Sequence, residues 1–320
     1  MHSPFRDVIV AVSIVQCFDD LVNTFTSWNV WQNKVTSYMV EIVKTTGEKE
    51  SFERAKFCDS LRKAGAPNDI TEDVCTKVES EILPGMSTTQ IFRKASKYLM
   101  KKNLPAGIRY NVKRGVELLG PAGFLFEQFV EILMRAEGYE HTARDQMMRG
   151  ECVEHEVDVV AEKGGERYIV EVKYHNQTSI KSPIEVVMYA DARREDIARA
   201  DVKAGRKIKH NLLLVTNTKF SANAIAYARC RGIALLGWQY PRERCLEDII
   251  REHMLYPTTV LPSVDRAARE AFARHDLMLV RDLAPFSKED IVKKFGIDER
   301  RARGIIREAH MLVYGKEHTD

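Results

Sequence analysis

Asp158, Glu171 and Lys173 have residue types and a spacing that could support metal-assisted hydrolysis. Each lies in or beside a short apolar run, and Gly164-Gly165 separates the two runs. Glycine pairs supply the positive φ angles of tight hairpin turns, so this stretch is predicted to form a β-hairpin. Because strand positions alternate between faces, Glu171 and Lys173 should share one face of the sheet, with Asp158 beside them on the partner strand.

Two carboxylates and a lysine on one sheet face are costly unless another charge compensates them. A divalent metal would do so, and Mg²⁺ takes oxygen ligands while keeping several waters. The carboxylates of Asp158 and Glu171 are therefore predicted to hold Mg²⁺ (or Mn²⁺). A lysine beside two carboxylates stays charged until metal binds, so Lys173 is expected to position a water and stabilise charge more than to act as a simple base.

Further elements in a recognisable order surround these residues: a helix that carries Glu127 before them, then a strand over 212–216, a helix over 222–230 and a strand over 232–236. Together with Asp158 and Glu171-Val172-Lys173, this order resembles the PD-(D/E)xK nuclease superfamily, and within it the Mrr-type restriction endonucleases.

The resemblance implies a restriction-endonuclease-like α/β/α domain over residues 119–256 that hydrolyses DNA phosphodiester bonds with Mg²⁺ or Mn²⁺. It implies Asp158, Glu171, Lys173 and Glu127 as catalytic residues, and Asp158, Glu171 and the Val172 carbonyl as metal ligands. Glu127 would support the metal site, and a solvated helix glutamate is the alternative for it.

Several neighbouring polar residues are further, weaker candidates for roles at this site. Glu156 shares a strand face with Asp158 and is either an extra metal contact or an ordinary edge residue. His175 shares a face with Lys173, and a surface histidine is the simpler interpretation. Arg193 and Arg194, in a helix predicted over 182–200, are weak candidates for DNA contacts.

Length and composition limit the number of domains and the kinds of partner that the chain can have. The 320 residues suggest two or three domains, and a net charge of +3 does not by itself argue for a nucleic acid partner. Six scattered cysteines without a C-x-x-C pair are expected to be reduced thiols of a cytoplasmic protein. No apolar run is long enough to span a bilayer, so no membrane partner is expected.

Residues 1–38 fit neither a signal peptide nor the region that follows them. The first recognisable domain begins at Met39, so we expect Met39 to be the natural start and residues 1–38 to be an upstream extension. A genuine but poorly structured leader is the alternative.

Residues 39–118 are predicted to form a short β-hairpin followed by four helices, over 52–64, 71–83, 88–102 and 107–119. The hairpin turn at Gly47, the pair Thr88-Thr89 and the pair Arg109-Tyr110 resemble an ATP-cone, a regulatory nucleotide-binding module. Ser87 or Thr88 is expected to begin the third helix, and Thr71 the second.

The ATP-cone resemblance implies ATP or dATP as an effector. Lys44 and Lys56 would contact phosphates, Ile42 and Phe52 would flank the base, and Glu50 would make a polar nucleotide contact. The family often has Lys-Arg before the turn where this chain has Lys44-Thr45, which leaves the ATP or dATP preference open. A retained fold without nucleotide binding is the alternative. No hydrolysis is implied, because the chain has no GxxxxGK[ST] loop.

Residues 257–320 are predicted to be all-helical, with helices over 261–274, 288–294 and 299–313. The turn Phe295-Gly296-Ile297 and the residues after it resemble a helix-hairpin-helix motif, whose glycine turn presents amides to a DNA phosphate. The DNA-binding candidates are Gly296, Lys293, Arg300 and Arg301, with Lys207 and Lys209 from a separate basic run. A protein–protein version of the motif is the alternative.

The chain is thus predicted to be an α/β multidomain, nucleotide-regulated, Mg²⁺-dependent DNA endonuclease. DNA and an adenine nucleotide are its expected partners, and a homodimer is a candidate assembly for cutting both strands. The alternatives are a nucleotide-sensing DNA-binding regulator with a catalytically silent nuclease fold, and an interaction protein whose three modules are structural.

Overall fold

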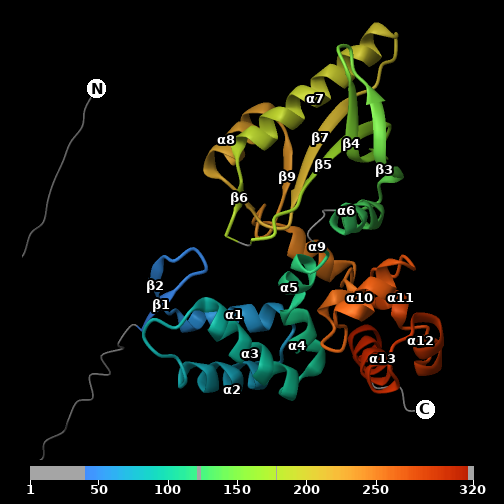
Figure 1. Cartoon of the computed structure of the whole chain (residues 1–320). Helices are drawn as coiled ribbons and strands as arrows, with labels where there is room; N and C mark the ends of the chain where they lie inside the picture. Colours follow the sequence, from blue (N-terminus) through green and yellow to red (C-terminus); the bar gives the residue numbers. More distant parts are fainter. Residues whose placement is uncertain (1–39, 121–123, 178, 316–320) are drawn as a thin grey trace, which may run out of the picture. The chain divides into compact units, whose positions relative to one another are not determined.

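The computed structural model describes residues 40–120, 124–177 and 179–315 (Figure 1). These residues belong to one unit, Met39–Asp320, and the hypothesis about a start at Met39 concerns residues outside the described part. Among the helices described, none is both long and apolar enough to cross a membrane.

The first region has the predicted hairpin and helices. Strands β1 (Glu41–Val43) and β2 (Lys49–Ser51) pair antiparallel. The helices that follow are α1 (Arg54–Lys63), α2 (Asn68–Glu79), α3 (Thr88–Lys102), α4 (Leu104–Tyr110) and α5 (Val112–Glu117). Ser87 caps α3 in a capping box with Gln90, so the first of the two predicted caps is the one used.

Two helix predictions in this region were wrong in detail. Helix α2 begins at Asn68, before Thr71, whose buried hydroxyl bonds the Ala66 carbonyl at 3.4 Å instead of capping a helix. The predicted fourth helix is divided at Asn111 into α4 and α5. The Asn111 side-chain amide donates to the Gly107 carbonyl at 2.7 Å, and so competes with the helical hydrogen-bond pattern there.

The expectation that all cysteines are reduced was wrong for one pair. Cys58 of α1 and Cys75 of α2 are both buried and joined by a disulfide, with their Cα atoms 5.8 Å apart. Cys152, Cys230 and Cys245 are free. The bridge links two helices whose cysteines are separated by 17 positions, a proximity that spacing alone does not reveal.

The central region contains a five-stranded mixed sheet in the order β3-β4-β5-β7-β9. Its strands are β3 (Glu140–Arg149), β4 (Glu154–Lys163), β5 (Glu166–Lys173), β7 (His210–Thr216) and β9 (Ala234–Leu236). Strands β3, β4 and β5 are antiparallel, and β5, β7 and β9 are parallel. Two short strands, β6 (Lys181–Ser182) and β8 (Lys219–Phe220), pair separately.

Helices cover both faces of this sheet (Figure 1). Helix α6 (Phe124–Ala136) packs with one set of sheet residues, which includes Val170 and Val172. Helices α7 (Ile184–Lys203) and α8 (Ala222–Arg231) pack with the other set, which includes Ile169 and Leu212. Alternate residues of β5 therefore meet different helices.

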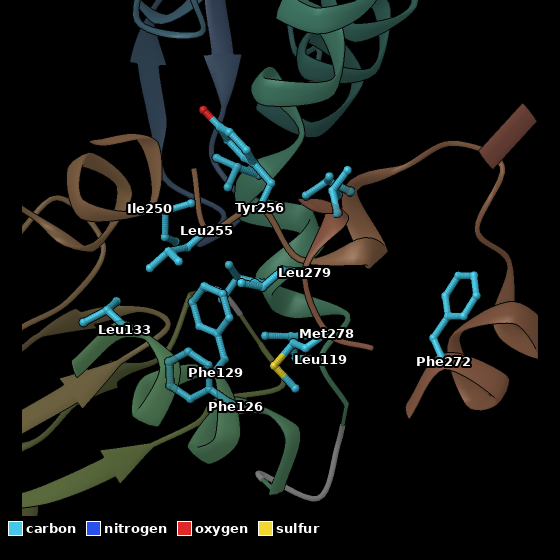
Figure 2. Packing of buried hydrophobic residues seen from close by; sticks show 14 of the residues in the cluster. Leu119, Phe126, Phe129, Leu133, Ile250, Leu255, Tyr256, Phe272, Met278 and Leu279 are labelled. Atoms are coloured by element: carbon cyan, nitrogen blue, oxygen red, sulfur yellow. The ribbon is translucent and has the colours of Figure 1, made fainter. Parts of the chain in front are cut away.

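After β9, helix α9 (Leu246–Glu252) and the 3-10 helix η1 (Thr258–Val260) lead to α10 (Arg266–Ala273), α11 (Val280–Leu283), α12 (Lys288–Phe295) and α13 (Glu299–Tyr314). The helix predicted over 261–274 starts later, because Asp265 caps it. Side chains from this region join those of α6 in one buried cluster, where Phe126 and Phe129 lie beside Met278 and Leu279 (Figure 2).

Candidate active site

Two carboxylates lie near each other at the end of the β4–β5 hairpin that is opposite its turn. The turn Gly164-Gly165 has positive φ angles of 59° and 77°, as tight hairpins require. The pairing of β4 with β5 extends from this turn to Val159 opposite Val170. Asp158 and Glu171 are the next residues beyond this last pair, and the charge of Asp158 acts on Glu171, so the two carboxylates lie near each other where the ladder ends.

Asp158 is fixed in place by the backbone of the partner strand. Its Oδ2 accepts a 2.7 Å hydrogen bond from the Val172 amide. Beyond the last strand pair this amide would otherwise have lost its partner, so the carboxylate takes the role that a β4 carbonyl has elsewhere. The other Asp158 oxygen accepts no hydrogen bond from any residue in the described ranges.

Burial and mutual repulsion raise the pKa values of these acids. Burial, followed by the charge of Asp158, raises the pKa of Glu171 to about 7. Burial also raises the pKa of Asp158, while the Val172 hydrogen bond opposes the rise. The pKa of Glu127, on α6, is raised by burial and then by Asp158. The three predicted acids therefore form one electrostatic group, in which burial and like charge oppose ionisation.

Two cations partly compensate this group. Arg193 of α7 donates from Nη1 to Glu171 Oε2 at 2.6 Å, with side-chain exposures of 12% and 14%. Lys173 is exposed at the end of β5, and its ammonium forms no hydrogen bond or ion pair with any residue of the described part. Its charge nevertheless acts on Glu171.

A divalent metal fits this donor set. Asp158 and Glu171 offer carboxylate oxygens, the ligand type that Mg²⁺ prefers, and a bound cation would offset the burial that raises their pKa values. Within residues 40–120, 124–177 and 179–315, no three His, Cys, Asp or Glu side chains converge closely enough to hold a metal alone. The remaining ligands would come from the backbone, such as the Val172 carbonyl, or from solvent.

Sequence reasoning missed one acid near this group and underestimated one cation. Asp145 lies on β3, has a positive φ of 53°, and raises the pKa values of Glu127 and Asp158. Nothing in the segment 140–149 predicted a strand. Arg193 was only a weak DNA candidate, and its helix position gave no sign of a partner on β5.

Several neighbouring residues have structural roles. His155 lies 2.9 Å from Asp196, a buried carboxylate that also accepts from the Cys152 and Val153 amides. His175 Nε2 lies 2.9 Å from the hydroxyl of buried Ser182. Neither histidine is part of the acidic group.

The first region contains a pocket of about 200 Å³ at the hairpin. Four of the five predicted nucleotide contacts line it: Ile42, Glu50, Phe52 and Lys56. Lys44 is not among its lining residues and lies 3.0 Å from Glu50.

Two aromatic residues that were not predicted as base contacts also line this pocket. The rings of Phe92 and Tyr110 are stacked with centroids 4.9 Å apart. The pocket therefore has an aromatic wall and a cationic edge at Lys56.

The DNA-binding candidates are dispersed. Gly296 ends α12 in the left-handed conformation, with φ 67°. At the start of α13 the Asp298 side chain accepts from the Arg301 amide, so a carboxylate occupies the end expected to receive a phosphate. Arg301 also pairs with Asp265 and Asp298. Lys209 pairs with Glu166 at 2.7 Å.

The remaining candidates are free of such pairs. Arg300, Lys293 and Lys207 form no ion pair with any residue of 40–120, 124–177 or 179–315. Their charge is therefore available, and their distribution over two regions defines no single basic surface.

Comparisons with known proteins support a nuclease-like domain in this chain. Residues 122–239 match the restriction endonuclease family of Mrr catalytic domains, and residues 256–313 match the family described as AF1548-like, C-terminal. An uncharacterized protein from Archaeoglobus fulgidus is 35% identical over 184 residues, which are 57% of this chain and 98% of that protein. The chain belongs to the AF1548-like family.

This AF1548-like chain therefore contains the predicted Mrr-type restriction endonuclease-like domain, followed by an AF1548-like C-terminal domain. The crystal structure of AF1548, a protein of unknown function, is 34% identical and covers 60% of this chain and 99% of its own, with a TM-score of 0.49. The structure of Can2 from Sulfobacillus thermosulfidooxidans in complex with cyclic tetra-adenylate is 14% identical, covers 65% and 64%, and has a TM-score of 0.30. The ATP-cone and helix-hairpin-helix assignments stay predictions.

Proposed function

We propose that this AF1548-like chain is a divalent-metal-dependent DNA endonuclease whose activity responds to a nucleotide bound in its first region. The observation that carries the proposal is the proximity of Asp158 and Glu171 at the end of the β4–β5 ladder, with Lys173 two residues later and without an ion pair among the described residues. This arrangement lies within a restriction endonuclease-like domain.

Asp158 and Glu171 would hold Mg²⁺ or Mn²⁺, with the Val172 carbonyl as a further ligand and Glu127 in support. Such a cation lowers the pKa of an attacking water and stabilises charge on the phosphate. Lys173, at the exposed end of β5, orients the water and offsets the developing negative charge. The Asp158 hydrogen bond to the Val172 amide keeps both carboxylates in register.

The pocket lined by Ile42, Phe52 and Lys56 supports a nucleotide effector, ATP or dATP. The aromatic wall of Phe92 and Tyr110 suits a purine, because stacked rings bury flat apolar area. A lysine ammonium on its edge suits a phosphate. The effector acts by binding one conformation of the protein better than another.

Nicking of supercoiled plasmid tests the proposal. Purified protein with Mg²⁺ or Mn²⁺ should convert the plasmid to nicked or linear form, and Lys173→Ala should lower the rate about a hundredfold or more. Lys163→Ala is the matched control, because Lys163 lies at the other end of the same hairpin and donates to the Glu137 carbonyl. ATP and dATP should change the wild-type rate.

The second candidate function is a nucleotide-sensing DNA-binding regulator with a silent nuclease site. The Arg193–Glu171 ion pair favours it, because a proposed metal ligand is already engaged. DNA and nucleotide binding without cleavage in any divalent metal would move the assignment to this regulator.

A further inference from the structure

Arg193 is the buried cation closest to the proposed metal ligands. It lies on α7, which covers the sheet face that Glu171 occupies, and its Nη1 is 2.6 Å from Glu171 Oε2. Its charge also acts on Asp158. A guanidinium keeps its charge at every physiological pH, so in this state it substitutes for part of the charge that a metal would bring.

The next residue on the same helix shows how Arg193 differs from a structural arginine. Arg194 donates to Asp191 from both Nε and Nη2, at 3.1 Å and 2.6 Å, and Asp191 also accepts from Tyr227 and Arg231. Arg193 is bound through one nitrogen, while its buried Nε has no hydrogen-bond partner in the described residues. A buried donor without a partner is costly, so Arg193 is held less completely in its present position than Arg194 is.

The Arg193 guanidinium also contacts an aromatic side chain that is exposed to solvent. Arg193 stacks over the ring of Tyr189 with 5.0 Å between the guanidinium carbon and the ring centroid, and Tyr189 is 63% exposed. The arginine thus lies between a proposed metal ligand and an exposed aromatic side chain on the first turns of α7. A short rotation of its side chain would carry the charge from the carboxylate toward solvent.

We propose that Arg193 competes with the divalent cation for Glu171 and, once displaced, contacts a phosphate of the DNA. This inference rests on the proposed function and adds a residue to it. The charges support the sequence of events. A divalent cation neutralises Asp158 and Glu171, which leaves the positive charges of Arg193 and Lys173 without a counterion until a phosphate arrives. The planar guanidinium suits a phosphate as well as a carboxylate.

Metal affinity is the deciding measurement. Mn²⁺ is titrated into the full-length, DNA-free protein by calorimetry, for wild type, Arg193→Met and the matched control Arg194→Met. We expect Arg193→Met to bind Mn²⁺ about tenfold more tightly, because a competitor and a like charge are removed. Arg194→Met should bind like wild type. A merely structural arginine would give the opposite sign, since a distorted site binds metal less tightly.

DNA affinity tests the second step. With Ca²⁺ in place of Mg²⁺, a labelled duplex should bind Arg193→Met about three- to tenfold more weakly than wild type and Arg194→Met unchanged. Arg193→Lys keeps the charge and should restore most of the DNA affinity, and Arg193→Gln replaces Arg193→Met if the methionine variant does not fold.

Each result decides the inference. Unchanged or weaker Mn²⁺ binding by Arg193→Met overturns the competition, and unchanged DNA affinity overturns the phosphate contact. If wild type binds Mn²⁺ and nicks plasmid while the variant behaves like wild type, this inference alone fails. If wild type binds no Mn²⁺, the proposed function fails and this inference fails with it.

Discussion

The hydroxyl of Tyr174 donates a 2.5 Å hydrogen bond to the backbone carbonyl of Glu117. Tyr174 directly follows Lys173, and Glu117 is the last residue of α5. The Tyr174 ring also packs against Phe126, with centroids 5.7 Å apart. The end of the strand that carries Glu171 and Lys173 is therefore attached to the last helix of the first region.

This attachment predicts a route for the nucleotide effect. Tyr110, which lines the nucleotide pocket, ends α4 just before α5 begins. Tyr174→Phe should keep the nucleotide-free cleavage rate within about threefold of wild type, because only one hydrogen bond is lost. The change in rate that ATP or dATP causes should shrink at least by half.

Plasmid nicking with and without nucleotide measures this directly. Tyr168→Phe is the control, because Tyr168 lies on the same strand and packs edge-on against Tyr139 instead. An undiminished nucleotide effect in Tyr174→Phe would show that the hydrogen bond to Glu117 does not transmit it.

Protons and metal should compete for Glu171. Burial raises the pKa of Glu171 to about 7, so the metal-free folded protein holds a proton there that the unfolded chain releases near pH 4.5. This group therefore lowers the stability of the metal-free fold as pH rises from about 4.5 to 7. Metal must displace the proton below pH 7, so the apparent Mn²⁺ affinity should rise about tenfold per pH unit and level off above it.

Calorimetric Mn²⁺ titrations between pH 5 and 8, in buffers of the same ionic strength, check this prediction. Glu171→Gln should lose both the affinity and its pH dependence. Glu156→Gln changes a neighbouring carboxylate on β4. Its Mn²⁺ affinity should still change with pH around a midpoint near pH 7. A flat pH profile in wild type would contradict the prediction.

Asp196 should stabilise the protein in a pH-dependent way. Its hydrogen bond with His155, together with those from Cys152 and Val153, holds the pKa of Asp196 at about 2. The carboxylate also lies against Gly150, where an added Cβ would be 2.0 Å from Oδ2. Because the folded pKa is lower than the unfolded one, this stabilisation is present above about pH 4 and is lost between pH 4 and 2.

Thermal unfolding at pH 7, 4 and 2.5 tests this role. Asp196→Asn should lower the melting temperature by several degrees at pH 7, and the difference from wild type should shrink toward pH 2. Glu151→Gln is the control, because exposed Glu151 makes surface ion pairs with Arg199 at 3.6 Å and Lys203 at 3.9 Å, and such pairs contribute little to stability. Equal destabilisation of Asp196→Asn at all three pH values would mean that charge is not the cause.

The parts of the site that sequence could predict are those encoded locally. Gly164-Gly165 fixes the turn, and the register of the hairpin then brings Glu171 near Asp158. The order of helices and strands from α7 to β9 was likewise predicted from short stretches of sequence, each taken by itself. Local rules therefore predicted the sheet region and two of its carboxylates.

The parts that sequence could not predict depend on packing between distant segments. Strand β3 has no alternating pattern and becomes a strand by pairing with β4, which brings Asp145 to the acids. The Arg193–Glu171 pair spans 22 positions and requires the packing of α7 on the sheet. The Cys58–Cys75 bridge likewise depends on how α1 meets α2.

The nucleotide pocket leads to a prediction that separates binding from folding. Lys56 lies on its edge with its side chain 68% exposed, and Glu50 is its only ion-pair partner in the described ranges, at 4.0 Å. Lys56→Ala should therefore leave the melting temperature unchanged and weaken ATP binding about tenfold, as expected when a phosphate loses one cation. Lys63→Ala, on the same helix but paired with Asp59, should bind ATP like wild type. Equal ATP affinity in both variants, measured by calorimetry, would place the phosphates elsewhere.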